Sequence, residues 1–217
     1  MPALGYWKTR VLAQPIRLLL NYVGEEFEDV HYLMGEGPDF SKEAWLSVKQ
    51  TLGLPFPDLP YYIDGEVKLT QSNAILRYIA RKYDLLGRTT QEVIDCDVMF
   101  ENAVDFRNAT TAVTYNPNYE KLKDKYLENL QPKLESFENF LGDKSWFAGN
   151  SITVCDFPIY ELLDVHEVMF PRILDKFPNL TAFTARFEAL PNIKQYMSSD
   201  KFLARPINNK WAGFIGN

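Results

Sequence analysis

Few side chains in this sequence belong to types that carry out chemistry on their own. The two cysteines, Cys96 and Cys155, lie within helical patterns and fit small buried apolar groups. The two histidines, His31 and His166, lie far apart, and neither has a second ligand at metal-binding spacing, so no metal site is predicted. Tyr6, near the end of the first predicted strand, carries a hydroxyl whose pKa near ~10 keeps it protonated at neutral pH, so it can act as a hydrogen-bond donor. A tyrosine at such a position is usually part of the core, and the sequence pattern alone favours that role.

A second candidate site is the start of a helix predicted over residues 73–83. Gln71 and Ser72 precede it, and a helix N-terminus offers free N–H groups and the positive end of its dipole to a carboxylate. The Ser72 hydroxyl would add a further donor. The same serine also fits a plain N-cap, and the pattern alone favours that simpler role.

Composition excludes several classes of protein. The chain has 217 residues, of which 46% are hydrophobic and 24% charged, as expected of a globular protein with a sizeable core. Its net charge of -6 argues against nucleic acid or an anionic membrane as a partner. No apolar run approaches the ~18 residues of a membrane span, and the first residues lack a signal-peptide pattern. With two cysteines and no disulfide framework, we expect a cytoplasmic protein.

The elements that must position these residues change in character along the chain. The first part predicts alternating strands and helices, with a tight hairpin at Asp64-Gly65 and Pro15 and Gly24 bounding the first helix. The second part predicts long helices punctuated by prolines. The predicted elements of the first part are a strand at 3–8, a helix at 16–23, a strand at 27–33, a loop at 34–41, a short helix at 43–50, a hairpin at 61–69 and a helix at 73–83. Those of the second part are helices at about 90–115, 119–141, 154–169 and 179–197.

Residues 153–156 have the form of a capping box that starts one of these helices. Thr153 stands at the capping position, and Asp156 stands where Glu or Gln is usual. Together these patterns divide the chain into an α/β domain at 1–82, a linker at 83–89 and an all-helical domain at 90–217.

Five short motifs stand in a recognisable order along the chain. They are Gly5-Tyr6-Trp7, LPFPDLP at 54–60, QSNAI at 71–75, WFAGN at 146–150 and FPNL at 177–180. With these motifs the sequence strongly resembles a cytosolic glutathione transferase over essentially its whole length. The Gly-Tyr-Trp start and the loop at 34–41 are most similar to the mu class. The resemblance implies a thioredoxin-like N-terminal domain with a mixed four-stranded sheet, then an all-helical domain, in a homodimer or a heterodimer with a same-class subunit.

The resemblance also implies an activity. Glutathione would be the cosubstrate, with no permanently bound cofactor, and small, mostly apolar electrophiles would be the second substrates. Tyr6 would be the catalytic residue, donating a hydrogen bond to the glutathione thiolate. Lowering a thiol pKa from ~8.5 by ~2 units stabilises the thiolate by about 2.7 kcal/mol.

Matching positions imply a glutathione site in the N-terminal domain. Lys42 stands where an arginine is common and Asp58 where an asparagine is common, which predicts binding weaker by about 1 kcal/mol. The Leu59-Pro60 peptide is implied to be cis. The implied glutathione-binding residues are Trp7, Lys42, Trp45, Lys49, Asp58, Leu59, Gln71 and Ser72, with Asp105 of the partner subunit.

An electrophile pocket and a dimer contact are implied in the same way. The Tyr115 hydroxyl would hydrogen-bond to an oxygen on which charge develops, and Phe56 would insert into the partner subunit. The other implied pocket residues are Thr9, Leu12, Arg107, Asn108, Thr111, Asn208 and Asn209. Several are polar, so we expect a more polar electrophile than is usual.

Three other functions fit the same fold. A glutathione-dependent isomerase would use the same thiolate. A carrier of apolar ligands would bind without turnover. A scaffold protein would show a damaged glutathione site. Conjugation is the favoured interpretation.

Overall fold

The computed structural model describes all 217 residues. The first part of the chain forms a four-stranded sheet in the order β2-β1-β3-β4. β1 pairs in parallel with β2 and antiparallel with β3, and β3 pairs antiparallel with β4. This is the mixed sheet that the sequence predicted. The elements of this part are β1 (Ala3–Trp7), α1 (Gln14–Val23), β2 (Glu28–Tyr32), α2 (Glu43–Leu46), β3 (Tyr61–Asp64), β4 (Val67–Thr70) and α3 (Ser72–Lys82).

Glycine shapes the sheet at two points. A Cβ on Gly5 of β1 would lie 2.1 Å from the Tyr61 ring, so only glycine lets the neighbouring strand bring that ring so close. Gly65 takes φ 59° in the turn between β3 and β4. The predicted Asp-Gly hairpin is therefore confirmed.

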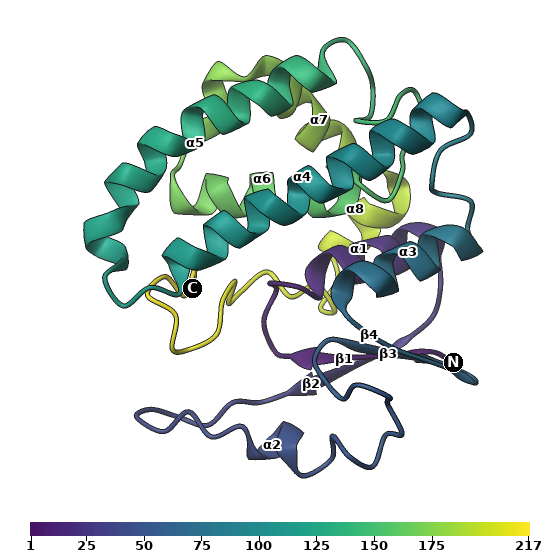
Figure 1. The fold of residues 1–217 in the computed structure, drawn as a ribbon, viewed down its shortest axis with the longest axis vertical. Coiled ribbons are helices and arrows are strands. Elements are labelled where there is room, and N and C mark those ends of the chain that lie inside the picture. The colour runs from purple at the N-terminus through teal and green to yellow at the C-terminus, as the bar shows by residue number, and fades with distance from the viewer.

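Two helices cover one face of the sheet. α1 and α3 lie between the sheet and the helical part of the molecule, whereas α2 lies beyond the opposite side (Figure 1). Pro15 stands in the first turn of α1, and Gly24 ends the helix at φ 71°, both as predicted. Ile16 and Ile79 are fully buried at this contact.

The rest of the chain is helical, as predicted, apart from its C-terminal tail. α4 and α5 are long; α4 lies beside α6 and α5, and α5 packs against α7. The prediction of one helix over 179–197 was wrong, because the chain breaks between α7 and α8. Leu190 is extended at φ -58° and ψ 129° immediately before Pro191, whose ring disfavours helical backbone in the preceding residue. The elements are α4 (Thr90–Thr114), α5 (Tyr119–Leu141), α6 (Asp156–Met169), η1 (Ile173–Lys176), α7 (Pro178–Glu188) and α8 (Pro191–Met197).

Two predicted helix starts differ in the structure. Ser72 is the first residue of α3 rather than its N-cap, and Gln71, at φ 71°, flanks the helix without a side-chain cap. The predicted box at Thr153 is half formed. The Asp156 carboxylate accepts from the Thr153 N–H at 2.7 Å, but the Thr153 hydroxyl donates to that carboxylate instead of capping a backbone N–H.

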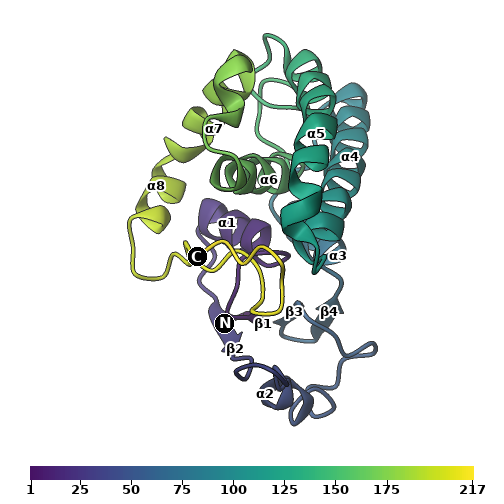
Figure 2. The same ribbon diagram turned by 90° about the vertical axis from the view of Figure 1, so that its left-hand side faces the viewer.

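The C-terminal tail returns to the first domain. After α8 the chain runs down past α1 towards the sheet (Figure 2). The N–H groups of Arg10 and Val11 donate to the carbonyls of Pro206 and Ile207 at 3.2 and 3.3 Å. This contact places the tail beside the loop between β1 and α1. No helix is both long and apolar enough to cross a bilayer.

Candidate functional site

Tyr6 stands near the C-terminal end of β1 with its side chain 4% exposed. Burial raises the pKa of its hydroxyl far above the usual value, so the group stays neutral at physiological pH. The nearby Leu12 backbone N–H and the charges of Arg17 and Arg107 oppose this effect and lower the pKa. The hydroxyl donates to no group within the chain, so its hydrogen is available to an anion bound beside Tyr6.

The N-terminus of α3 provides a second group of donors. Gln71 takes a left-handed conformation that turns the chain into the helix, and the first helical residue, Ser72, is 7% exposed. The first N–H groups of a helix have no partner within it, so they point at any acceptor bound near Ser72 at this helix end. The Arg107 guanidinium donates to the Asn73 side-chain oxygen at 3.2 Å, which brings a positive charge against the same helix end.

The Leu59-Pro60 peptide bond is cis. The Leu59 N–H donates to the Asp58 carboxylate at 2.8 Å. A ligand backbone that pairs with Leu59 would have to displace this carboxylate. Asp58, which stands where an asparagine is common, therefore competes directly with such a ligand for the Leu59 N–H.

Aromatic rings build the adjoining surface. Trp45 is buried and stacks on Tyr61 with 6.0 Å between ring centroids. Trp7 is also buried and meets Tyr32 edge-on at 6.5 Å. Lys49 is half-buried on the turn that follows α2. The structure thus brings these predicted residues to the side of the sheet that carries α2.

A strap of two contacts joins the loop at 34–42 to the C-terminal tail. The Lys42 ammonium lies 5.0 Å from the ring centroid of Trp211, and Lys210 forms an ion pair with Glu36. Trp211 is 39% exposed, and its ring also meets Tyr115 at 5.8 Å. Lys42 is therefore engaged with an aromatic ring instead of standing free.

Tyr115 follows α4 and is half-buried, and burial raises its pKa. Its hydroxyl accepts from the backbone N–H and the side-chain amide of Asn209 at 3.1 and 3.3 Å, which leaves its own hydrogen free to donate. Asn208 donates to the Phe214 carbonyl at 2.8 Å. Both asparagines therefore hold the tail in place, and Asn209 also orients Tyr115.

A narrow pocket opens between the two parts of the chain, and its enclosed volume is about 30 Å³, roughly the share of one water molecule. Its walls come from the start of α1 and from α3, α4 and α6, and they include the predicted residues Leu12, Ser72 and Arg107. The six other predicted electrophile residues do not line it. Tyr115, Asn208 and Asn209 lie together where the tail meets the end of α4. Thr9 is buried, Thr111 is half-buried and Asn108 is exposed.

Comparison with known proteins decides the family. Residues 2–81 match the family described as "Glutathione S-transferase, N-terminal domain", and residues 104–200 match "Glutathione S-transferase, C-terminal domain". The chain is 50% identical over 209 residues to glutathione S-transferase Mu 1 of Homo sapiens, covering 96% of each chain. It is 51% identical over the same length to a glutathione S-transferase of Mesocricetus auratus, again covering 96% of each. The chain belongs to the mu class of glutathione S-transferases.

Solved transferase structures share the same fold. The glutathione S-transferase Blo t 8 superposes with a TM-score of 0.90 at 33% identity, covering 98% of this chain and 99% of that one. The Pi-class glutathione S-transferase of Onchocerca volvulus superposes with a TM-score of 0.85 at 32% identity, covering 97% and 99%. The expected fold, a four-stranded mixed sheet followed by a helical domain, is confirmed.

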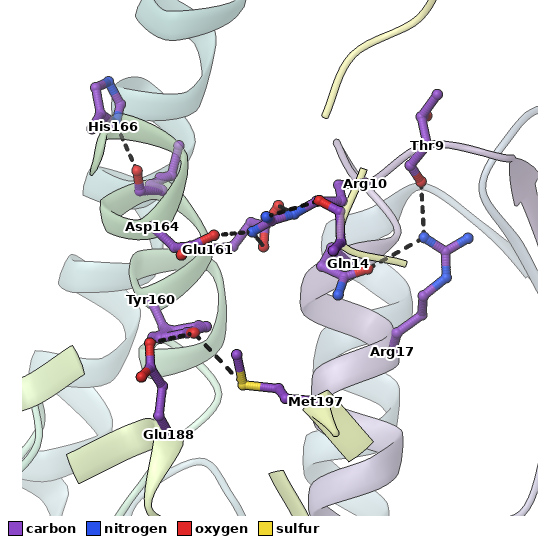
Figure 3. A network of polar contacts seen from close by, with 12 residues as sticks. Thr9, Arg10, Gln14, Arg17, Tyr160, Glu161, Asp164, His166, Glu188 and Met197 are labelled. Carbon is purple, nitrogen blue, oxygen red and sulfur yellow. Dashed lines mark hydrogen bonds and ion pairs between the residues drawn. The ribbon is translucent and has the colours of Figure 1, made fainter. Parts of the chain in front are cut away.

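The site of this mu-class transferase also depends on residues that sequence reasoning missed. Arg10, in the loop between β1 and α1, donates to Glu161 at 3.0 and 2.7 Å and to Asp164 at 2.5 Å (Figure 3). Against the opposing effect of burial, the two carboxylates raise the pKa of Arg10, while burial raises that of Glu161 to about 7. This network ties α6 to the loop that carries Leu12 and so supports the contact with Tyr6. Nothing in the sequence near Arg10 indicated a partner so far along the chain.

Trp211 was missed for a different reason. It lies in a tail without periodicity, where no pattern marks a side chain as part of a site. An isolated tryptophan among polar residues near the C-terminus was the only available signal.

Proposed function

We propose that this transferase conjugates glutathione to small electrophilic compounds. The glutathione thiolate attacks the electrophilic carbon, a carbon–sulfur bond forms, and the leaving group departs with the electron pair of its bond. The observation that carries the proposal is the buried Tyr6 hydroxyl, which burial keeps neutral and which donates to no group within the chain. A donated hydrogen bond favours the charged form of the acceptor, so it lowers the pKa of the bound thiol.

The glutathione site that we propose extends from Tyr6 along one edge of the first domain. The γ-glutamyl carboxylate would meet the donors at Ser72 and Gln71, and the cysteinyl backbone would pair with Leu59. The glycyl carboxylate would meet Lys49 and the Trp45 indole N–H. The remaining proposed contacts are Trp7, Lys42 and Asp58. Glutathione is a cosubstrate here, and no permanently bound cofactor is proposed.

Tyr115 is the residue that we propose for the electrophile. Its free hydroxyl hydrogen and its anchoring by Asn209 suit a donor to an oxygen on which negative charge develops. An orientation fixed in advance matters because a preorganised donor needs no rearrangement as the charge appears.

We propose that the protein works as a homodimer in the cytoplasm. Phe56 is 78% exposed on a loop of the first domain, and an aromatic side chain so exposed fits an anchor in a two-fold interface. Asp105 is exposed and forms no ion pair within the chain, so Asp105 of the partner subunit could reach the ammonium group of glutathione. Both cysteines are free and buried, which suits a reducing compartment. We retain the domain limits 1–82 and 90–217, with a linker at 83–89.

The test is direct product formation. The purified protein is incubated with glutathione and 1-chloro-2,4-dinitrobenzene, and mass spectrometry should find the thioether in which sulfur has replaced chlorine. Tyr6→Phe removes only the hydroxyl and should slow this reaction at pH 7 by about 25-fold, because a thiol pKa that rises from ~6.5 to ~8.5 lowers the thiolate fraction from roughly three-quarters to about 3%. Glutathione binding without product, in the wild type, would contradict the proposal and favour a carrier.

A further inference from the structure

A cavity of about 250 Å³ lies where the linker at 83–89, which runs from α3 to α4 (Figure 1), meets the helical domain. Its walls come from α1, the linker, the start of α4, the segment that precedes α6 and the junction of α7 with α8. None of the residues proposed above for glutathione or for the electrophile lines it. Because an apolar cavity of ~150 Å³ can hold a benzene molecule, this one has room for a small organic ligand.

Charged groups of both signs line this cavity without an ion pair. Arg88 and Asp84 are both exposed and form no salt bridge within the chain. Glu92 is half-buried, and its Oε2 accepts from the backbone N–H groups of Arg88 and Thr89 at 2.8 and 3.0 Å, whereas its Oε1 accepts from no group. These two hydrogen bonds lower the pKa of Glu92, so the carboxylate stays charged at neutral pH.

The free oxygen of Glu92 is held against the WFAGN motif at 146–150, which the proposed function does not use. A Cβ on Gly149 would lie 2.9 Å from Glu92 Oε1, and Gly149 has a φ of 151°, so glycine leaves room for the carboxylate. Gly149 is itself fixed, because it exchanges two backbone hydrogen bonds with Trp146 at 2.9 and 3.0 Å. Glu92 therefore offers an acceptor whose position is set before any ligand arrives.

The same cavity also offers unused donors and apolar contacts. Trp146 lines it with only 7% of its surface exposed, and its indole N–H donates to no group within the chain. The Ser151 hydroxyl, on the same wall, has no partner either. Leu85, Ile152 and Leu190 provide aliphatic surface. A ligand that brings an acceptor to the indole would supply the hydrogen bond that this largely buried N–H lacks.

We propose that this cavity binds a small zwitterion with an apolar body, namely an α-amino acid with an apolar side chain. The carboxylate of the amino acid would contact Arg88 and the Trp146 N–H, and its ammonium group would donate to Glu92 Oε1. A cation alone would leave Arg88 unpaired, and an anion alone would leave the free oxygen of Glu92 unpaired, so a ligand with both charges complements the cavity best. The apolar side chain would pack on Ile152 and Leu190.

The experiment measures dissociation constants by calorimetry, with and without saturating glutathione. The ligands are L-phenylalanine, 2-phenylethylamine, which lacks the carboxylate, and 3-phenylpropionate, which lacks the ammonium group. Glu92→Gln removes a charge but keeps an oxygen for the backbone N–H groups, since glutamine also serves in a capping box. Arg88→Gln removes the guanidinium. Glu66→Gln and Arg81→Gln are the matched controls, because each removes one exposed charge of the same sign outside the cavity.

L-Phenylalanine should bind wild type about fivefold more tightly than either analogue, equivalent to ~1 kcal/mol, and saturating glutathione should not change this. Glu92→Gln should weaken L-phenylalanine and 2-phenylethylamine about fivefold and leave 3-phenylpropionate unchanged. Arg88→Gln should weaken L-phenylalanine and 3-phenylpropionate and leave 2-phenylethylamine unchanged. Both controls should match wild type with all three ligands.

Several results would overturn the proposal. They are no binding of L-phenylalanine to wild type, equal affinity for the three ligands, and equal losses in the variants and their controls. Binding that saturating glutathione abolishes would also overturn it, because L-phenylalanine would then occupy the glutathione site. Wild type alone tests the preference for a zwitterion, so that result stands even if a variant does not fold. No outcome depends on turnover, so the proposed conjugation is tested separately.

Discussion

His166 should make the folded protein sensitive to acid through a single buried ring. The imidazole is fully buried on α6, stacked on Phe106 at 4.6 Å between centroids. Its Nδ1 lies 2.6 Å from the Leu162 carbonyl and its Nε2 lies 2.7 Å from the Tyr126 hydroxyl. This arrangement fits the neutral ring, with Nδ1–H donating and Nε2 accepting. Adding a proton would leave a buried cation with no carboxylate partner, and burial accordingly lowers its pKa to about 4.

The size of the effect follows from the two protonation equilibria. The unfolded chain binds a proton on this histidine near pH ~6.5, whereas the folded protein does so only near about 4. The stabilising contribution is therefore complete above the unfolded pKa and is lost as the pH falls towards the folded pKa. Between about pH 7.5 and about pH 5 the loss amounts to about 2 kcal/mol.

The assay is urea unfolding of wild type and His166→Gln at both pH values, at one fixed protein concentration because dissociation would otherwise contribute. Glutamine cannot titrate, so the variant should lose about 2 kcal/mol less stability than wild type over this interval. Burial raises the pKa of Asp156 to about 6 and that of Glu161 to about 7, and these groups favour the folded state as the pH falls. Both are present in both proteins, so their effects cancel in the difference.

His166→Gln will also be less stable than wild type at neutral pH, and that loss carries no weight in the comparison. The quantity of interest is the change with pH. If wild type and variant lose the same stability between the two pH values, the buried histidine does not resist protonation and the reasoning is wrong.

Two further predictions concern the dimer and the glutathione site. Phe56→Ala should weaken dimerisation by about 3 kcal/mol or more, seen in sedimentation velocity over a concentration series. Leu33→Ala removes another exposed apolar side chain and serves as its control; a dimer equally stable in both variants would contradict the role of Phe56. The double variant Lys42→Arg with Asp58→Asn should tighten glutathione binding about fivefold, or ~1 kcal/mol, in calorimetry. An unchanged dissociation constant would show that neither departure weakens the site.

Much of the fold could be predicted from the sequence because the residues that bound its elements act locally. Gly24 ends α1 in a left-handed conformation, and Asp64-Gly65 closes a hairpin, each through a backbone preference of the residues themselves. The sequence signal for the break between α7 and α8 was equally local, because Pro191 restricts the backbone of the residue before it. Helical periodicity on both sides of Pro191 nevertheless favoured one continuous helix. The start of α4 was also readable: Thr89 and Glu92 have capping-box spacing and form both bonds of the box.

The functional site was harder to predict from the sequence because its geometry depends on distant parts of the chain. Asn209 reaches Tyr115 across 94 positions, and Arg10 reaches Glu161 across 151. No spacing rule connects residues so far apart, so Asn209 was predicted only as a pocket residue and Arg10 carried no prediction. The role of Tyr6 came from family resemblance rather than pattern. The structure adds the physical basis, a buried neutral hydroxyl that donates to no other group of the chain.

The most direct test of thiolate activation is a titration of bound glutathione, in which thiolate absorbance is followed against pH in wild type and Tyr6→Phe. Wild type should show an apparent thiol pKa near ~6.5, about 2 units below that of a free thiol, and Tyr6→Phe should return it towards ~8.5. A wild-type pKa that stays near ~8.5, or an equally low pKa in both proteins, would contradict the assignment of Tyr6 as the group that activates the thiol.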